Sequence, residues 1–274
     1  MPFTFLSHQG GVLPLKLLDR GRLDGVALVV GSMAPDLAYV VLGTSWTFDA
    51  HTVAAQAWFA APVAVAVAAV LRRWVVRPLA AHLPPGGPLH LRDYSGVAGR
   101  RHPLVVTALS GLIGGCSHIF LDAFTHDDGF FVRRSRLLRI RFEPAGHRVP
   151  VFGLLQGSFT VLGAMVTVWT LWMLARRRRP AGDNPVSAHS VVVATAASRA
   201  RLWGSVAAGS LAGVAVSGAL HPAGGGPAFV IRVAWGIGLG LVAGCSWAAH
   251  VLGPGPSLDD ESLTANGGGG RATR

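Results

Sequence analysis

The stretch GGCSHIFLDAFTHDDG, Gly114–Gly129, decides how this chain is interpreted. It ends an apolar run that starts near Leu104 and is long enough to cross a bilayer, which takes about 20 apolar residues. His118, Asp122 and His126 are spaced i, i+4, i+8, so on an α-helix they form one polar stripe. A carboxylate at membrane depth costs roughly 2.5–3.5 kcal/mol, so it indicates a function. Metal binding, proton handling and helix packing are the three readings.

The composition predicts an all-α protein, a polytopic membrane helical bundle. The chain has 274 residues, of which 51% are hydrophobic and 14% charged, whereas a soluble domain has about 25% charged residues. Its net charge of +11 comes almost entirely from arginine. Pairs and runs such as Arg72–Arg73 and Arg176–Arg179 stand at the ends of apolar runs, as the positive-inside rule requires. No basic groove rich in aromatic residues accompanies them, which argues against nucleic-acid binding.

Neither the cysteines nor the first residues point to secretion. Cys116 and Cys245 both lie in apolar runs, where they make neither a disulfide framework nor a zinc knuckle. The start of the chain has no basic region before an apolar core, so we expect no cleavable signal peptide. Internal segments are therefore expected to direct membrane insertion.

Hydropathy divides the chain into about six transmembrane spans. The expected spans are Val26–Gly43, Val53–Leu71, Leu104–Phe124, Val151–Leu174, Leu202–Leu220 and Ala228–Leu252. We expect four segments: a motif-bearing bundle (1–175), a basic linker (176–201), a transmembrane hairpin (202–252) and a disordered tail (253–274). Because the last two spans contain no acid, we interpret them as an anchor or bundle partner. The polar site is then expected to need only the first segment.

The arginine pattern predicts an orientation in a bacterial cytoplasmic membrane. The loops 44–52 and 221–227 lack lysine and arginine and are assigned to the outer side. Asp36, His51 and the stripe then lie at a similar depth, near the outer face. The loop Thr125–Val149 carries six arginines and departs from the rule, so either the third span is re-entrant or this loop is an amphipathic surface segment.

Histidines and aspartates that meet at one depth suit a divalent metal. Mixed His/Asp ligands fit zinc, with manganese and iron as alternatives. Such an ion lowers the pKa of a bound water to about 7 and so supplies a nucleophile for hydrolysis. Asp127 or Asp128 would orient a ligand or act as a base. Against this, Asp36 could cap a helix broken at Pro35, and the stripe could serve packing alone.

Most other histidines are expected to lie in loops or at helix ends. They are His82, His90, His102, His147, His189, His221 and His250. His8 is a separate case, because the charge pattern places it near the inner face unless residues 9–18 cross or dip into the membrane.

Four separated motifs carry a resemblance to a known family. They are MPFTFLSHQGGVLP, GSMAPDLAYV, GCSHIFLDAFTHDDGFFV and VPVFGLLQ, in this order. Over about residues 1–175 the chain resembles a family of bacterial membrane proteins, domain-of-unknown-function family 4184. More remotely it is similar to the YdjM-type inner-membrane metal-dependent hydrolases and to the helical zinc phospholipase C fold.

The YdjM likeness implies a set of metal ligands. On that likeness, the residues at ligand positions are His8, Asp36, His51, His118 and Asp122, while His126 comes from the stripe. Thr52 follows His51 where the family tends to have serine, and Leu37–Ala38 replaces a more acidic context, which argues against a full multinuclear site.

The sequence therefore supports three functional hypotheses. The first is a metal-dependent hydrolase at the outer membrane face, acting on a phosphoester or lipid head group. The second is a transporter or an ion or proton relay through Asp36, His118 and Asp122. The third is a structural membrane protein. Membrane lipids are expected partners in all three, whereas the pattern names neither a substrate nor an oligomeric state.

Overall fold

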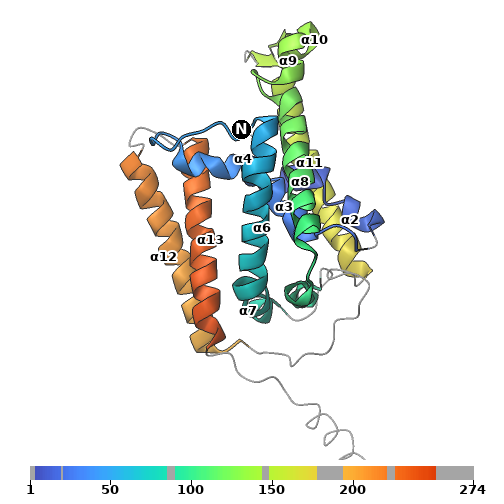
Figure 1. The fold of residues 1–274 in the computed structure, drawn as a ribbon. Helices are drawn as coiled ribbons and strands as arrows, with labels where there is room; N and C mark the ends of the chain where they lie inside the picture. Colours follow the sequence, from blue (N-terminus) through green and yellow to red (C-terminus); the bar gives the residue numbers. More distant parts are fainter. Residues whose placement is uncertain are drawn as a thin grey trace, which may run out of the picture.

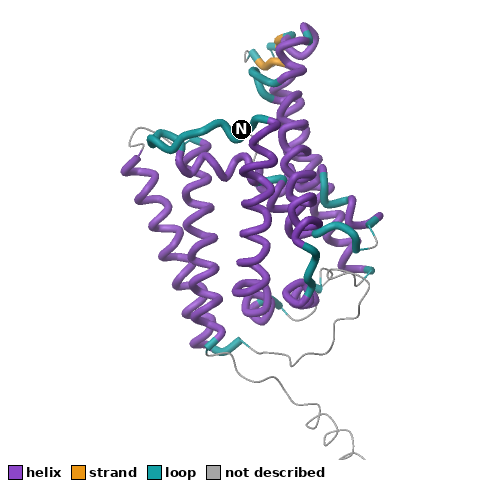
Figure 2. The backbone as a smooth tube through the Cα atoms, viewed as in Figure 1, coloured by secondary structure: helices purple, strands orange, loops and turns teal. Residues whose placement is uncertain are grey.

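A computed structural model describes residues 4–19, 21–84, 90–143, 148–177, 194–220 and 226–250. Long helices stand side by side as a bundle (Figure 1), and almost all regular structure is helical (Figure 2). The longer elements are α6 (Ala61–Val70), α8 (Leu104–Thr125), α11 (Val151–Arg176), α12 (Ala196–Leu220) and α13 (Pro227–Ala249). The prediction of an all-α membrane bundle is thus confirmed.

Shorter elements fill the space between the long helices and cover their ends. Before α8 these are α1 (Thr4–Ser7), η1 (His8–Gly11), α2 (Leu15–Leu18), α3 (Gly25–Gly31), α4 (Ala34–Leu37), η2 (Ala38–Val41), α5 (Val53–Ala55), η3 (Gln56–Ala60), η4 (Leu71–Val75), α7 (Val76–His82) and η5 (Leu91–Gly99). After α8 come α9 (Phe130–Arg134), α10 (Arg136–Arg139) and an antiparallel pair of short strands, β1 (Arg141–Phe142) and β2 (Val149–Pro150).

Five helical segments of the described chain are long and apolar enough to span a membrane. They are Val53–His82, Leu104–Arg134, Val151–Arg176, Ala196–Leu220 and Ala228–Ala249. The first predicted span, Val26–Gly43, is not one continuous helix, because α3 ends at Gly31 and α4 begins at Ala34. Pro35 has no backbone N–H and cannot continue a helix from the preceding turn. The count of about six was therefore close.

Glycines allow α3 to pack against α8 at backbone distance. A β-carbon added at Gly31 would meet the backbone of Gly111, and one added at Gly114 would lie 2.6 Å from the Ser32 nitrogen. Small residues at such crossings are the usual means by which membrane helices approach closely. This crossing sets the distance between the break after α3 and the polar stripe of α8.

We predict that Gly114→Ala destabilises the bundle, while Gly157→Ala does not. A methyl group at Gly114 overlaps the backbone of α3, and such overpacking costs about 1–3 kcal/mol. The position of Gly157 on α11 has nothing within 4 Å, so alanine there should be neutral or stabilise by up to about 1 kcal/mol. Thermal unfolding in one detergent compares the two variants, and equal melting temperatures would contradict the close crossing.

A buried acid fixes the start of α3. Asp24 is fully buried and caps α3 by accepting hydrogen bonds from the backbone nitrogens of Val26 and Ala27. It also accepts from Arg72 at 2.6 Å and from the Thr107 hydroxyl at 2.8 Å. Burial alone would raise the pKa of Asp24, but the hydrogen bond and charge of Arg72 outweigh this effect and lower the pKa. Asp24 thereby ties α3, η4 and α8 together.

Large apolar side chains face outward along the long helices. Examples are Leu104, Val161, Leu211 and Leu239, which are 68%, 59%, 70% and 62% exposed. A soluble protein would bury such side chains, whereas a lipid-facing surface exposes them. This surface is therefore suited to contact with lipid.

The arginine-rich loop after α8 forms short helices and a strand pair at one end of the bundle (Figure 1). Its six arginines are all exposed; they are Arg133, Arg134, Arg136, Arg139, Arg141 and Arg148. Because α8 is continuous over Leu104–Thr125, the structure favours the amphipathic surface segment over a re-entrant third span.

Candidate metal centre

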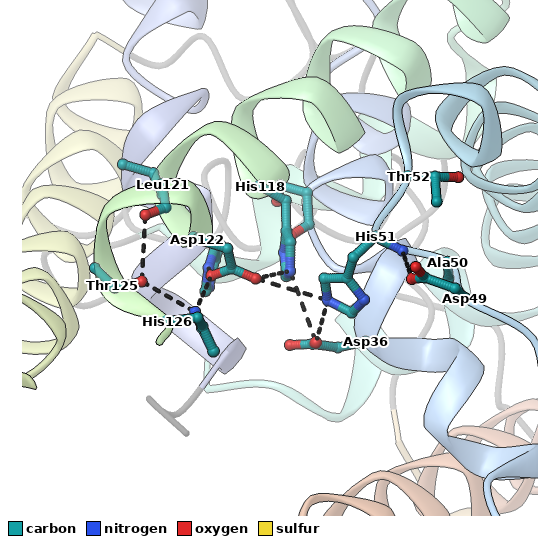
Figure 3. A network of polar contacts seen from close by, with 12 residues as sticks. Asp36, Asp49, Ala50, His51, Thr52, His118, Leu121, Asp122, Thr125 and His126 are labelled. Atoms are coloured by element: carbon teal, nitrogen blue, oxygen red, sulfur yellow. Dashed lines mark hydrogen bonds and ion pairs between the residues drawn. The ribbon is translucent and has the colours of Figure 1, made fainter. Parts of the chain in front are cut away.

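Six predicted site residues converge where α8 nears its C-terminal end. Figure 3 labels five of them, all except His8. His118 and Asp122 lie one turn apart on α8, and His126 caps its C-terminus. The other three come from separate segments: His8 begins η1, Asp36 lies in α4, and His51 precedes α5.

Asp122 is at the centre of this cluster, and its two carboxylate oxygens contact different imidazoles. Oδ1 lies 3.2 Å from His8 Nε2 and 3.4 Å from His126 Nδ1. Oδ2 lies 3.1 Å from His118 Nε2 and 3.6 Å from His51 Nε2. The helical spacing of the stripe thus predicted contacts that the structure contains.

Asp36 adds a second carboxylate on one side of the cluster. Its Oδ1 lies 3.2 Å from His51 Nε2 and 3.6 Å from His118 Nε2. The break at Ser32–Met33, just ahead of Pro35, separates α4 from α3, and α4 carries Asp36 to the site. Asp36, His51 and the stripe were expected to lie at a similar depth, and in the structure their side chains are in direct contact.

The break between α3 and α4 also fixes the tautomer of His118. The carbonyl of Ser32, at that break, lies 2.8 Å from His118 Nδ1 and can only accept a hydrogen bond. His118 Nδ1 must therefore carry a proton, so in the neutral ring Nε2 has a lone pair. This nitrogen is buried and makes no hydrogen bond of normal geometry among the described residues, although carboxylate oxygens face it.

The cluster has a buried floor and a more accessible side. His118 is fully buried, and His8 and Asp36 are 5% and 7% exposed. His51 and His126 are 27% and 25% exposed. Burial lowers the pKa of His8 below its ordinary value, despite the opposing hydrogen bond with Asp122, so the ring is favoured in the neutral form that binds metals.

The donor set fits a divalent cation. Ligand atoms of His8, His118 and Asp122 all lie within 4.8 Å of one another, and so do those of Asp36, His51 and His118. Imidazole lone pairs that face carboxylates repel them unless a proton or a metal ion lies between. An imidazole oriented by a backbone carbonyl, with further imidazoles and carboxylates beside it, is the environment typical of zinc.

The remaining candidates lie at the edge of the site or away from it. Asp127 and Asp128 are exposed in the turn after α8, where the Asp127 side chain accepts from the Asp128 backbone. Of the histidines expected in loops or at helix ends, His82 ends α7 and contacts the Ser198 hydroxyl at 3.0 Å, and His250 caps α13. His147, His189 and His221 lie outside the described residues.

Sequence reasoning missed the residues that hold the site segments in place. Arg232, on α13, is 2% exposed and donates to the Val40 carbonyl at 3.1 Å and to the Leu42 carbonyl. Trp235 Nε1, one turn later, donates to the Leu37 carbonyl at 3.2 Å. A lone arginine in the middle of an apolar run was the available signal, because a charge at that depth needs a partner.

These contacts bear on the expectation that the site needs only residues 1–175. Arg232 and Trp235 of the C-terminal hairpin donate hydrogen bonds to the segment that comes directly after Asp36. The expectation stays untested, and the contacts argue against it.

Fold and site together define a multi-pass helical membrane protein with a buried His/Asp cluster at one end of its bundle. The chain belongs to the DUF4184 family, a domain of unknown function, whose sequence model matches residues 1–249. That match includes α12 and α13 and so extends well past the motifs in residues 1–175. Searches of curated proteins and of solved structures found no match, and the likeness to YdjM-type hydrolases stays a prediction.

Proposed function

We propose that this protein is a metal-dependent hydrolase of the bacterial cytoplasmic membrane, acting on a phosphoester or lipid head group near the outer face. The observation that carries the proposal is the buried Nε2 of His118, which lies 3.6 and 3.1 Å from the carboxylates of Asp36 and Asp122 and in the neutral ring turns a lone pair toward them. A proton or a metal ion would relieve that repulsion, and three further imidazoles around it favour the metal.

In this proposal each residue has a defined part. The metal ligands are drawn from His8, Asp36, His51, His118, Asp122 and His126, and Ser32 keeps His118 in the binding tautomer. A bound divalent ion supplies Lewis acidity and a nucleophilic water at neutral pH. Asp127 or Asp128, exposed beside His126, would accept a proton from that water or orient the substrate. The buried floor excludes bulk water, while the side of His51 and His126 admits the substrate.

The test is elemental analysis of protein purified in detergent without chelators, followed by hydrolysis assays. We expect zinc, manganese or iron in the purified protein. We also expect release of a phosphorylated or alcohol product from phospholipids or simple phosphoesters, abolished by chelation and restored by the metal. Metal-free protein after metal-replete purification would refute the proposal.

A proton or ion relay is the second candidate function. The observation in its favour is the unbroken chain of contacts from His126 through Asp122 and His51 to Asp36, with no gap above 3.6 Å. A relay predicts pH-driven or potential-driven flux in vesicles by a protein that holds no metal. Metal content therefore separates the two functions.

Thiol labelling can test whether the end of the bundle that holds the cluster faces the outer side of the membrane. In Figure 1 α8 ends at the same end of the bundle where α6 begins, whereas α11 ends at the opposite end. We predict that a cysteine at Ser45 reacts with an impermeant thiol reagent in intact cells, while one at Arg177 reacts only after permeabilisation. Both are exposed, and both are placed in a background lacking Cys116 and Cys245. Equal labelling in intact cells would overturn the orientation.

A further inference from the structure

We propose that the cluster binds two divalent ions bridged by the carboxylate of Asp122, an inference that rests on the proposed function. The observation behind it is the stacking of two candidate ligands. The rings of His8 and His118 have centroids 4.0 Å apart and planes inclined by only 19°.

Although the ligand atoms of His8, His118 and Asp122 lie within 4.8 Å of one another, the two stacked imidazoles cannot share one ion. A metal lies near the plane of an imidazole that ligates it, about 2.0–2.1 Å from the nitrogen for zinc. Two planes inclined by 19° and separated by a stacking distance have no common point that close to both rings. An ion between the rings would sit far out of both planes and receive neither lone pair. His8 and His118 therefore serve different ions.

Each ring also has only one nitrogen available. His118 Nδ1 is committed to the Ser32 carbonyl at 2.8 Å, and His8 Nδ1 faces the Ser7 hydroxyl at 3.4 Å. The two Nε2 atoms remain, and both contact Asp122, but at opposite oxygens: His8 at Oδ1, and His118 at Oδ2. A carboxylate whose two oxygens meet two separate imidazoles has the arrangement of a bridging ligand.

The other candidate ligands divide along the same line. On the Oδ2 side, Asp36 and His51 lie with His118, so the first ion would have four protein ligands. On the Oδ1 side, His126 is 3.4 Å from the carboxylate, so the second ion would have three ligands: His8, His126 and Asp122.

This division assigns different tasks to the two ions. Four protein ligands close a tetrahedral site, whereas three leave the open position that catalytic sites keep. The open position falls beside His126, on the more accessible side of the cluster. Paired ions about 3.5–4 Å apart are typical of enzymes that act on phosphate esters, because they stabilise both the attacking and the leaving oxygen. Among the substrates of the proposed function, the two-ion centre thus favours phosphoesters.

The experiment counts zinc in the full chain. The protein is loaded with excess zinc in detergent, passed through gel filtration to remove loose metal, and analysed for zinc per chain. We expect two zinc ions in the wild type, one in His8→Ala, and two in the matched control His250→Ala, whose histidine caps α13 away from the cluster. X-ray absorption of the zinc-loaded wild type should show a second zinc at about 3.5–4 Å.

The outcomes separate this inference from the function on which it rests. One zinc per wild-type chain would overturn the two-ion centre and leave the proposed function standing. No zinc after loading, together with no manganese or iron in the purified protein, would overturn both. Two zinc ions with no neighbouring zinc within about 4 Å, or two zinc ions retained by His8→Ala, would overturn the bridge through Asp122. The wild-type measurements decide the question even if His8→Ala fails to fold.

Discussion

Asp122→Asn is expected to remove most of the bound metal from the purified protein. Asparagine keeps the shape of the side chain but removes the negative charge that balances a cation. It also replaces one acceptor oxygen by a donor, while both oxygens of Asp122 contact imidazole nitrogens at 3.1–3.4 Å. Loss of a supporting residue outside the ligand shell costs about 10–100-fold in metal affinity, so a loss of more than about 100-fold is expected for a central ligand.

The effect on stability distinguishes a ligand from a packing residue. If Asp122 only joins helices, the substitution should cost about 0.6 kcal/mol, the average for a hydrogen bond between membrane helices. If it binds metal, added zinc should stabilise the wild type by about 2.7 kcal/mol at a hundred times its dissociation constant and should not stabilise the variant. Thermal unfolding in detergent, with and without zinc, measures this difference.

Two companion variants make the Asp122 result specific. His118→Ala should lose metal to a similar degree, and the double variant should lose little more, because the two residues act on the same ions. Asp93→Asn makes the same acid-to-amide change in η5, outside the cluster, and should keep wild-type metal content. Retention of metal by a folded Asp122→Asn protein would remove Asp122 from the centre of the site.

The fold and the α8 part of the site were predictable because helical signals are local. Apolar runs long enough to span a bilayer gave five long segments, and the i, i+4 spacing predicted the contact of His118 with Asp122. Pro35 likewise predicted a disturbed helix, although it did not show that the break would free the Ser32 carbonyl for His118.

The position of His8 was less accessible to sequence reasoning. The segments α1, η1 and α2 are too short for any periodic signal, and the charge pattern alone put His8 near the inner face. In the structure this segment packs on α11, where a β-carbon added at Gly10 would meet the backbone of Gly163. Such a contact links residues more than a hundred positions apart, and no local pattern encodes it. Only the resemblance to metal-dependent hydrolases implied the ligand role of His8.

The second large effect is expected from Arg232→Met. Methionine keeps an apolar side chain of similar length but removes the donors to the Val40 and Leu42 carbonyls. Hydrogen bonds from charged groups contribute about 1.5–3 kcal/mol, so the variant should unfold at a lower temperature. Because η2 follows α4 directly, we also expect Asp36 to lose its fixed position, with a fall in zinc affinity of about 10–100-fold.

A purely structural role for Arg232 would lower stability without changing zinc affinity in the folded fraction. Zinc affinity is therefore measured by titration of monodisperse protein well below its melting temperature. Arg201→Met is the matched control, since Arg201 lies in the same hairpin and its side-chain contacts among the described residues are with Trp247. Trp235→Phe, which removes one hydrogen bond to the Leu37 carbonyl, should have a smaller effect in the same direction as Arg232→Met.

Truncation after Leu174 extends the same argument to the whole hairpin. It removes Arg232 and Trp235 together, so the Val40 and Leu42 carbonyls lose the charged donor and the Leu37 carbonyl loses the indole N–H. We expect the truncated protein to bind zinc more weakly than Arg232→Met does, because packing of α13 on η4 and α7 is also lost. If a well-folded truncated protein binds zinc as tightly as the full chain, the site is complete within residues 1–175 and the hairpin is only an anchor.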